Sequence, residues 1–410
     1  MRSPSHFSSR LAEAGALFGR ALAIPAVLGL RWTASSRREP GRGIPATGHS
    51  FWRSLQAAVD EVFVAAEVLG GPPSNFHEVE RLREEVDEAL AFQSRRGWQA
   101  DPASYHGAPP LPRTLPIVQR EEQGIRFEEL RFESGYAPWL GEPGRDRWLA
   151  YEENWHARVR LYRHRGGEER PWIVCIPGYR MGDPLVDHVG FRVRWLHEEL
   201  GFNVAVPVMP FHGPRRSGRR GGDGYLTGDF LDTLHAQAQA IWDVRRFLRW
   251  LEDEGATRIA IYGLSLGGHT AAMVAALEPG LECVVAGIPA VDLADLVHAN
   301  LPAPLAWLTR QVGFPWEEVD TLLRVVSPLE IAPAIARERC FIFAAEADGL
   351  APPSHARDLW EHWGQPTIAW YPGGHVSFAW EDAVENLLLQ AFTSTGLLSP
   401  LRRPSLRLVS

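Results

Sequence analysis

Lysine is absent from this sequence of 410 residues, and all 42 of its basic residues are arginines. A phosphate-binding P-loop, a pyridoxal-phosphate Schiff base and a serine–lysine dyad each require a lysine side chain. The sequence therefore excludes these three chemistries. We attribute the absence of lysine to codon usage, because none of the functions considered below requires a chain without lysine.

Cysteine is also scarce, with three residues at Cys175, Cys283 and Cys340. Each lies within a predicted buried strand and no two have C-x-x-C spacing, so we expect no disulfide framework. The sequence contains neither an H-E-x-x-H motif nor a cluster of histidines and cysteines. We therefore expect neither a metal site nor a cofactor.

Acidic residues outnumber basic residues, and the formal net charge is -8 at pH 7. No run of arginines is long enough to make a stretch of the chain strongly positive. This balance predicts no nucleic-acid partner. The apolar stretch at residues 21–30 contains Pro25 and is too short to span a bilayer. We interpret it as a docking helix of a cytoplasmic protein. A poor signal peptide and a helix in peripheral contact with a membrane surface are the alternatives.

The most informative stretch is residues 258–272, which predicts a short apolar strand, a sharp turn and a helix of small residues. Gly263, Ser265 and Gly267 give the turn the G-x-S-x-G spacing of a nucleophile elbow. Such a turn points the serine hydroxyl away from the backbone, and the two glycines let strand and helix approach closely. At the helix start, the backbone N–H of Leu266 is suited to bind a developing oxyanion.

The N-terminal part of the chain divides into three stretches. Residues 1–49 are rich in Ser, Arg, Gly and Pro and predict a flexible segment. Residues 50–123 predict a helical extension, with one amphipathic helix at 50–69 and a second that begins near Asn75, followed by a proline-rich surface linker at 97–116. The apolar stripe of the second helix consists of Val79, Leu82, Val86 and Leu90.

The apolar faces of these two helices cannot remain exposed to water. We expect them to dock on the rest of the same chain, since the linker is long enough to bring them back to its surface. A homodimer or a membrane surface would be the alternative docking partner.

The catalytic domain is predicted at residues 124–395, followed by a tail at 396–410. Half-exposed alternating strands come first, and continuous apolar strands follow, separated by helices at 191–200 and 231–251. The predicted strands are 125–132, 156–162, 172–176, 202–208, 258–262, 283–288, 340–344 and 367–371. This order predicts a mostly parallel sheet with an antiparallel edge, interrupted by an insertion at about 292–326.

A nucleophilic serine needs a base that takes its proton and a carboxylate that orients this base. Asp348 follows the strand at 340–344, and His375 follows the strand at 367–371. Ser265, Asp348 and His375 thus lie in this order at the ends of three strands, which meet at one edge of a parallel sheet.

From about residue 125 to residue 392 the chain resembles an α/β-hydrolase, a superfamily of esterases, lipases and serine peptidases. The matching motifs are the elbow at Ser265, Asp348 before Gly-x-x-Pro, and the Gly-His pair at His375. The resemblance implies an α/β-hydrolase fold, which is a mostly parallel sheet with helices on both faces. Here we expect a short helical lid insertion and a helical N-terminal extension in addition.

The resemblance also implies an oxyanion loop, and this motif matches only in part. Members often have His-Gly-x at this loop, whereas Pro177 stands here in place of the histidine. The donor would be a backbone N–H, by resemblance that of Tyr179, together with that of Leu266. The substitution therefore need not abolish the oxyanion hole, although it removes a usual support of the loop.

Other residues compete for places in the site. Glu346 and Asp292 are alternatives to Asp348 as the acid, although the acid before Gly-x-x-Pro fits the motif better. His269 directly follows the elbow, and we expect it to pack or cap rather than to transfer protons. The insertion at 292–326 has the apolar composition of a lid, as would any packed pair of helices.

Three further side chains are candidates for the substrate pocket. His212 lies at a strand end on the same edge of the predicted sheet. Arg180 and Arg215 are suited to bind a substrate carboxylate, or are solvated loop charges.

These residues predict a serine hydrolase that forms an acyl-enzyme: Ser265 attacks, His375 transfers the proton and Asp348 holds the imidazole. We expect a carboxylic-ester hydrolase acting on a small or acyl-chain ester, because the first 124 residues lack the length and repeats of a propeller gate. A serine peptidase, an acyltransferase and a non-catalytic binding protein of the same fold are the alternatives. The sequence carries no signal for an oligomeric state.

Overall fold

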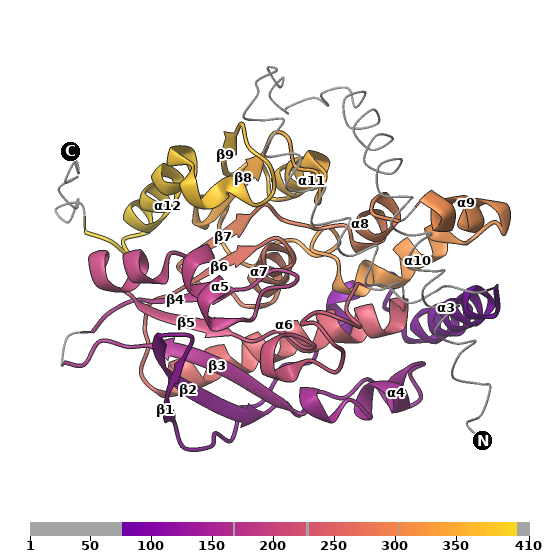
Figure 1. Ribbon diagram of the computed structural model, residues 1–410, viewed down its shortest axis with the longest axis horizontal. Coiled ribbons are helices and arrows are strands. Elements are labelled where there is room, and N and C mark those ends of the chain that lie inside the picture. Colours follow the sequence, from indigo (N-terminus) through magenta and orange to yellow (C-terminus); the bar gives the residue numbers. More distant parts are fainter. Residues whose placement is uncertain (1–75, 167–168, 227–228, 302, 400–410) are drawn as a thin grey trace, which may run out of the picture.

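A nine-stranded sheet forms the centre of the computed structural model, which describes residues 76–166, 169–226, 229–301 and 303–399 (Figure 1). The strands are β1 (Val118–Glu122), β2 (Ile125–Glu133), β3 (His156–Tyr162), β4 (Trp172–Ile176), β5 (Asn203–Pro207), β6 (Ile259–Leu264), β7 (Cys283–Gly287), β8 (Cys340–Ala345) and β9 (Thr367–Tyr371). The helices are α3 (Phe76–Arg96), α4 (Arg145–Leu149), α5 (Pro184–Gly190), α6 (Phe230–Asp253), α7 (Leu266–Leu277), α8 (Leu293–Ala299), α9 (Ala303–Gln311), α10 (Trp316–Leu323), α11 (Pro353–His362) and α12 (Asp382–Ser394).

The strand order is β1-β2-β3-β5-β4-β6-β7-β8-β9. Strands β1, β2 and β3 pair antiparallel, β3 pairs antiparallel with β5, and all strands from β5 to β9 in this order pair parallel. The predicted parallel sheet with an antiparallel edge is thus confirmed. Because β6, β8 and β9 run in the same direction, the segments that follow them emerge at one edge of the sheet.

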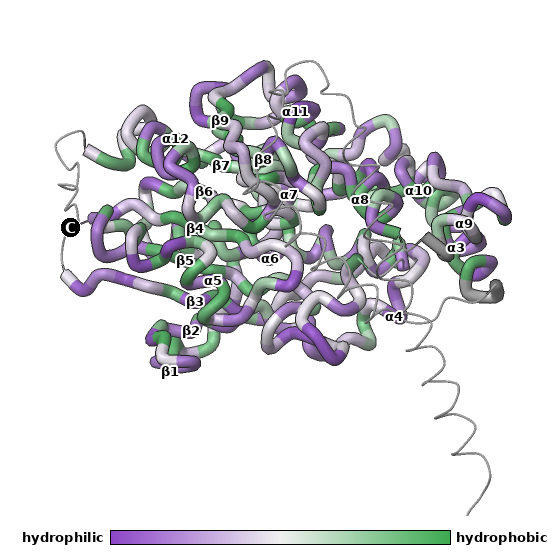
Figure 2. The backbone as a smooth tube through the Cα atoms, turned by 45° about the horizontal axis from the view of Figure 1, so that its top comes forward, coloured by the Kyte–Doolittle hydropathy of each residue, from purple (hydrophilic) through white to green (hydrophobic). Residues whose placement is uncertain are grey.

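Alternating side chains of the central strands divide the core into two layers. On β4, Val174 and Ile176 join the layer that contains residues of α6, α7 and α11. Ile173 and Cys175 join the opposite layer, which contains α12 and residues 191–200. Helical segments therefore cover both faces, and Figure 2 shows hydrophobic residues concentrated along the central strands. None of the helices in the described ranges is long and apolar enough to cross a membrane.

The helix predicted at residues 191–200 is present over a shorter range, and a separate helix, α5, precedes it. Helix α5 ends at Gly190, Arg192 has a φ of 50°, and residues 193–199 are helical, with a π turn at Trp195–Glu199. Helix α5 begins at Pro184 because the Asp183 side chain accepts hydrogen bonds from two backbone N–H groups of its first turn, and Pro184 fits its first position. This aspartate–proline pair is a start signal that the apolar periodicity did not contain.

The predicted surface linker at residues 97–116 is exposed over most of its length, but a few of its side chains anchor it in the core. Trp98 and Tyr105 are each only 4% exposed, and their rings pack edge to face. Arg245 and Arg246 of α6 donate hydrogen bonds to backbone carbonyls of this stretch. The stretch thus stays largely exposed, as predicted, while its aromatic anchors and the two arginines of α6 fix its position.

Helix α3 docks on the rest of the chain, against α10 and α6, as both views show for α3 and α10 (Figures 1 and 2). Val86 is 1% exposed, and the Gln93 side chain donates a hydrogen bond to the Leu322 carbonyl of α10 at 3.1 Å. Arg147 joins Glu85 of α3 to Asp229 at the start of α6. The second predicted helix therefore buries its stripe on its own chain. The first, at 50–69, and the segments 1–49 and 400–410 lie outside the described residues.

We expect Val86→Asp to lower the melting temperature by several degrees. The substitution places a charge in an apolar contact, which costs about 3 kcal/mol. Thermal unfolding followed by circular dichroism measures the shift. Asp87→Asn, on the exposed side of the same helix, is the matched control and should change little. Equal melting temperatures for Val86→Asp and the unmodified protein would contradict the docking of α3.

Candidate active site

Ser265 occupies a strained turn between β6 and α7, with φ 56° and ψ -116°. A Cβ atom at Gly263 would collide with the carbonyl of Gly267, and one at Gly267 would collide with the carbonyl of Ile176. The Ser265 N–H donates to the Gly287 carbonyl of β7 at 2.8 Å. The two glycines are thus required for the close approach of strand and helix, and the serine is held in a conformation that is costly for a residue with a side chain.

The structure brings together the three residues that the sequence predicts as a triad. His375 Nε2 lies 2.9 Å from Ser265 Oγ, and His375 Nδ1 lies 2.7 Å from Asp348 Oδ2. An ionised carboxylate only accepts hydrogen bonds, so Nδ1 carries the proton and Nε2 is left to accept from the serine hydroxyl. Asp348 and His375 are each 8% exposed. This arrangement has the geometry of a nucleophile, its base and the group that orients the base.

Backbone contacts fix the Asp348 carboxylate in place. Its Oδ1 atom accepts hydrogen bonds from the N–H groups of Leu350 and Ala351 at 2.9 and 2.8 Å, which leaves Oδ2 to the imidazole. Of the alternatives, Asp292 instead caps α8, where its side chain accepts from a backbone N–H. Glu346 lies two residues before Asp348 and is half-buried. Geometry therefore favours Asp348 as the partner of the histidine.

The predicted oxyanion loop passes directly beside the serine. A Cβ atom at Gly178 would lie 3.2 Å from Ser265 Cβ and 2.9 Å from the Leu264 carbonyl oxygen. Tyr179 follows Gly178 in this loop, and Leu266 is the first residue of α7. Both predicted donors thus belong to segments that flank the Ser265 side chain.

The three side chains predicted for a substrate pocket have other partners. Arg215 is fully buried and donates to the Asp243 carboxylate at 2.8 Å. Arg180 donates to Asp223 at 2.6 Å, with its side chain 14% exposed. His212 is fully buried, and its Nε2 accepts a hydrogen bond from the Arg180 backbone N–H at 3.2 Å. All three side chains thus have partners within the chain, and their role in a substrate pocket stays a prediction.

His269 and the insertion have structural contacts near the site. The His269 ring lies between two backbone carbonyls, those of Ala290 and Val326, at 2.9 and 2.7 Å, as the packing interpretation predicts.

The insertion forms α8, α9 and α10. The Asn300 side chain at the end of α8 donates to the Leu350 carbonyl at 3.1 Å, which connects the insertion to the loop that carries Asp348. That the insertion acts as a lid stays a prediction.

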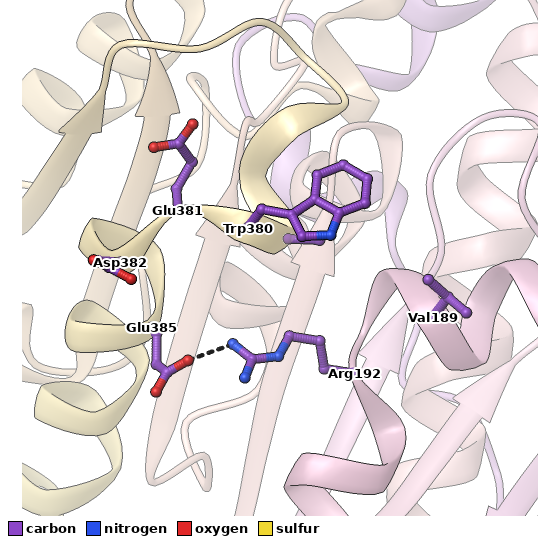
Figure 3. Close-up of a pocket in the computed structure, with 7 residues that line it drawn as sticks. Val189, Arg192, Trp380, Glu381, Asp382 and Glu385 are labelled. Atoms are coloured by element: carbon purple, nitrogen blue, oxygen red, sulfur yellow. Dashed lines mark hydrogen bonds and ion pairs between the residues drawn. The ribbon is translucent and has the colours of Figure 1, made fainter. Parts of the chain in front are cut away.

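A hollow of about 370 Å³ lies next to the segments that carry the site (Figure 3). It is lined by Val189, Arg192, Ala379, Trp380, Glu381, Asp382 and Glu385. Arg192 reaches from just after α5 to Glu385 on α12, with 2.6 Å between the charged groups, and Trp380 lies beside this pair (Figure 3). The residue Trp380 is 78% exposed and lies five positions after His375. No sequence motif marks this hollow, because its two sides are almost 200 residues apart in the chain.

Two residues that hold the end of the predicted oxyanion loop have no signal in the sequence. Asp187 Oδ1 accepts from the Gly182 N–H at 2.8 Å, and Arg160 donates to the Gly182 carbonyl at 2.6 Å. Arg160 and Asp187 also form a buried ion pair at 2.6 Å. In an alternating strand an arginine predicts an exposed position, so only the three-dimensional contact identifies this pair. Among the described residues, no group of three His, Cys, Asp or Glu side chains is placed to hold a metal ion.

Buried histidines make the stability of the fold depend on pH. Burial lowers the pKa of four of them to about 4: His106, His212, His235 and His269. Burial also raises the pKa of Glu142 to about 7 and that of Asp187 to about 6. Between pH 6.5 and 5, unfolding therefore takes up protons on the four histidines and releases protons from the two carboxyls, with a net uptake of about two.

We expect the free energy of unfolding to fall by about 3 kcal/mol per pH unit as the pH is lowered from 6.5 to 5. The histidines contribute stability above their unfolded pKa, and this contribution is lost as the pH falls towards 4. Urea denaturation at pH 7, 6 and 5 measures the change. Stability that stays constant or rises over this range would contradict the neutral buried histidines.

Comparison with known proteins adds three findings. Residues 152–293 match a family model described as alpha/beta hydrolase domain containing 18. Two uncharacterised proteins of Mycobacterium tuberculosis, from two strains, are each 38% identical to the chain over 347 residues, which cover 84% of this chain and 83% of each relative. Acetyl xylan esterase 1 from Thermoanaerobacterium is a structural neighbour at 16% identity and a TM-score of 0.49, covering 80% of this chain and 99% of that chain.

Proposed function

We propose that this chain is a serine hydrolase of carboxylic esters. The chain belongs to the α/β-hydrolase superfamily, and to one family with the two mycobacterial proteins. The observation that carries the proposal is the continuous chain of hydrogen bonds from Ser265 Oγ through His375 to Asp348, at 2.9 and 2.7 Å. A serine hydroxyl in such a chain can lose its proton at the moment of attack.

The reaction proceeds in two halves. Ser265 Oγ bonds to the ester carbonyl carbon while its proton moves to His375 Nε2, and the tetrahedral oxyanion lies against the N–H groups of Tyr179 and Leu266. The carbon–oxygen bond to the alcohol then breaks, and His375 gives the proton to the leaving oxygen. A water molecule repeats the sequence on the acyl-enzyme, releases the acid and restores the serine. Throughout, Asp348 stabilises the imidazolium that forms between these transfers.

We assign the hollow beside Trp380 to a substituent of the ester. One side is lined by residues between Ala379 and Glu385, which begin four positions after His375, and α5 on the other side follows the predicted oxyanion loop. An exposed indole offers apolar contact for a small group. The substrate is thus a small-molecule ester, and we retain the prediction of a cytoplasmic protein, with contact at a membrane surface as the alternative.

A panel of p-nitrophenyl esters from acetate to palmitate, beside aminoacyl p-nitroanilides, tests the proposal. We expect the esters to be turned over faster than the anilides. Both activities should depend on Ser265 to the same extent. Turnover of the anilides alone would replace the esterase by a peptidase. The absence of turnover on both sets, with the triad folded, would favour a binding protein.

A further inference from the structure

The oxyanion loop contains an unusual backbone conformation that requires support. Arg180 has a φ of 66°, in the left-handed region that residues with a side chain seldom occupy. Its backbone N–H donates a hydrogen bond to His212 Nε2 at 3.2 Å. This peptide directly follows Tyr179, whose own N–H is the predicted oxyanion donor. The Tyr179 N–H belongs to the preceding peptide, which is joined to this one at the Tyr179 Cα. A group that fixes the Arg180 N–H therefore limits how far the Tyr179 N–H can turn.

The contacts of His212 define which of its nitrogens carries the proton. Nδ1 lies 2.8 Å from the Pro210 carbonyl oxygen, which only accepts hydrogen bonds, so the proton is on Nδ1. Nε2 is then unprotonated and accepts from the Arg180 N–H. The ring is fully buried, and burial lowers its pKa to about 4. The imidazole thus stays neutral at physiological pH and keeps the acceptor that Arg180 needs.

Packing around His212 leaves little freedom for the loop. A Cβ atom at Gly222 would lie 2.9 Å from the Tyr179 ring and 3.0 Å from His212 Nε2, and one at Gly182 would lie 2.9 Å from His212 Cβ. The Tyr179 ring meets the His212 ring edge to face. His212 therefore contacts the loop on both sides of Arg180.

The loop is also held at its two flanks. The Arg180 guanidinium binds the Asp223 carboxylate at 2.6 Å and the Gly221 carbonyl at 2.7 Å. At the end of the loop, Asp187 and Arg160 hold the N–H and the carbonyl of Gly182. The Met181 N–H also donates to the Gly178 carbonyl at 3.2 Å and closes the turn that contains Tyr179 and Arg180. The Arg180 N–H bond to His212 acts on the peptide between these two residues.

We propose that His212 is a positioning residue for the reaction, whose Nε2 atom orients the Tyr179–Arg180 peptide and thereby aims the Tyr179 N–H at the oxyanion. This inference rests on the proposed hydrolase function. His212 takes over the support that Pro177, in place of a histidine, cannot give to the loop. Because the residue contacts no reacting atom, its effect is on transition-state stabilisation and not on substrate affinity.

Paired substitutions separate the acceptor from the shape of the ring. In His212→Gln the side-chain oxygen can reach the position of Nε2, whereas in His212→Asn the amide reaches only the position of Nδ1 and the Arg180 N–H loses its acceptor. Loss of an oxyanion donor costs about 10²- to 10³-fold in kcat. We expect kcat for a p-nitrophenyl ester to fall about 100-fold in His212→Asn and less than about 10-fold in His212→Gln, with KM changed little in both.

Amide hydrogen exchange, followed by mass spectrometry on the peptide that contains residues 177–182, provides a readout that does not need activity. We expect faster exchange at this peptide in His212→Asn than in the unmodified protein, with partial recovery in His212→Gln. If the two variants lose kcat equally, in proportion to a common loss of melting temperature, His212 acts by packing and the proposal is wrong. Unchanged exchange and unchanged kcat in both would also overturn it.

The same experiment distinguishes this proposal from the proposed function. If the unmodified protein shows no ester turnover that depends on Ser265, the hydrolase function fails, while the exchange rates still decide whether His212 holds the loop. If turnover depends on Ser265 but not on the acceptor at residue 212, the function stands and the positioning role fails.

Discussion

Ser265→Ala will lower kcat for p-nitrophenyl ester hydrolysis by about four to six orders of magnitude, because the substitution removes the atom that forms the acyl-enzyme. The remaining rate reflects binding and the oxyanion donors, which act without the nucleophile. The Ser265 hydroxyl contacts His375 and lies at a turn fixed by backbone bonds, so the fold should persist. Steady-state kinetics and a thermal melt on the same preparation measure both effects.

Ser354→Ala is the matched control for this substitution. Ser354 is a half-buried serine in the first turn of α11, away from the hydrogen-bonded chain of the triad. We expect its kcat to stay within a few-fold of the unmodified protein. Appreciable turnover in Ser265→Ala, after contaminating esterase has been excluded with a second independent preparation, would contradict the nucleophile assignment.

The second large effect is expected at the acid. Asp348→Asn should lower kcat by about 10⁴-fold, the size of effect that the same change has in a serine protease with this triad. An asparagine amide can donate to Nδ1, which moves the imidazole proton to Nε2 and removes the acceptor for the serine hydroxyl. Kinetics of Asp348→Asn and of Glu346→Gln, two residues away, compare the two candidate acids directly.

Glu346→Gln should cost less than about 10-fold, because the carboxylate that contacts His375 Nδ1 at 2.7 Å belongs to Asp348. The reverse order of the two variants would move the acid to Glu346. Equal losses in both, with a lowered melting temperature, would indicate that the loop and not the carboxylate was disturbed.

Eight of the nine strands and the candidate triad could be predicted from the sequence because their signals are local, whereas β1 lies in the stretch predicted as the N-terminal extension. The strands β3, β4 and β9 match their predicted bounds, since a buried strand must be continuously or alternately apolar. Ser265, Asp348 and His375 each lie in a short motif just after such a strand. Parallel pairing then places all three at one edge of the sheet without further information.

The support of the oxyanion loop could not be predicted, because it depends on contacts between distant residues. Arg160 lies in an alternating strand and Asp187 in a short helix, and neither belongs to a motif. His212 was predicted at a strand end as a pocket residue, and its contact with the Arg180 backbone was not predicted. Its burial and its bond to Arg180 depend on how three loops pack together, which periodicity does not describe.

The core anchoring of residues 97–116 was missed for a related reason. Proline-rich composition predicts solvent exposure on average, while two aromatic side chains, Trp98 and Tyr105, determine where this stretch lies. A few large side chains that gain burial against a long helix such as α6 can thus anchor a stretch that is otherwise exposed.

Covalent labelling tests the serine nucleophile most directly. The full-length protein is incubated with a fluorophosphonate, digested, and mapped by mass spectrometry, with Ser265→Ala and His375→Ala treated in parallel. We predict one adduct, on the peptide that contains Ser265, absent in Ser265→Ala and formed much more slowly in His375→Ala. A folded protein that forms no adduct, or that carries the adduct on another residue, would contradict the assignment of Ser265 as the nucleophile.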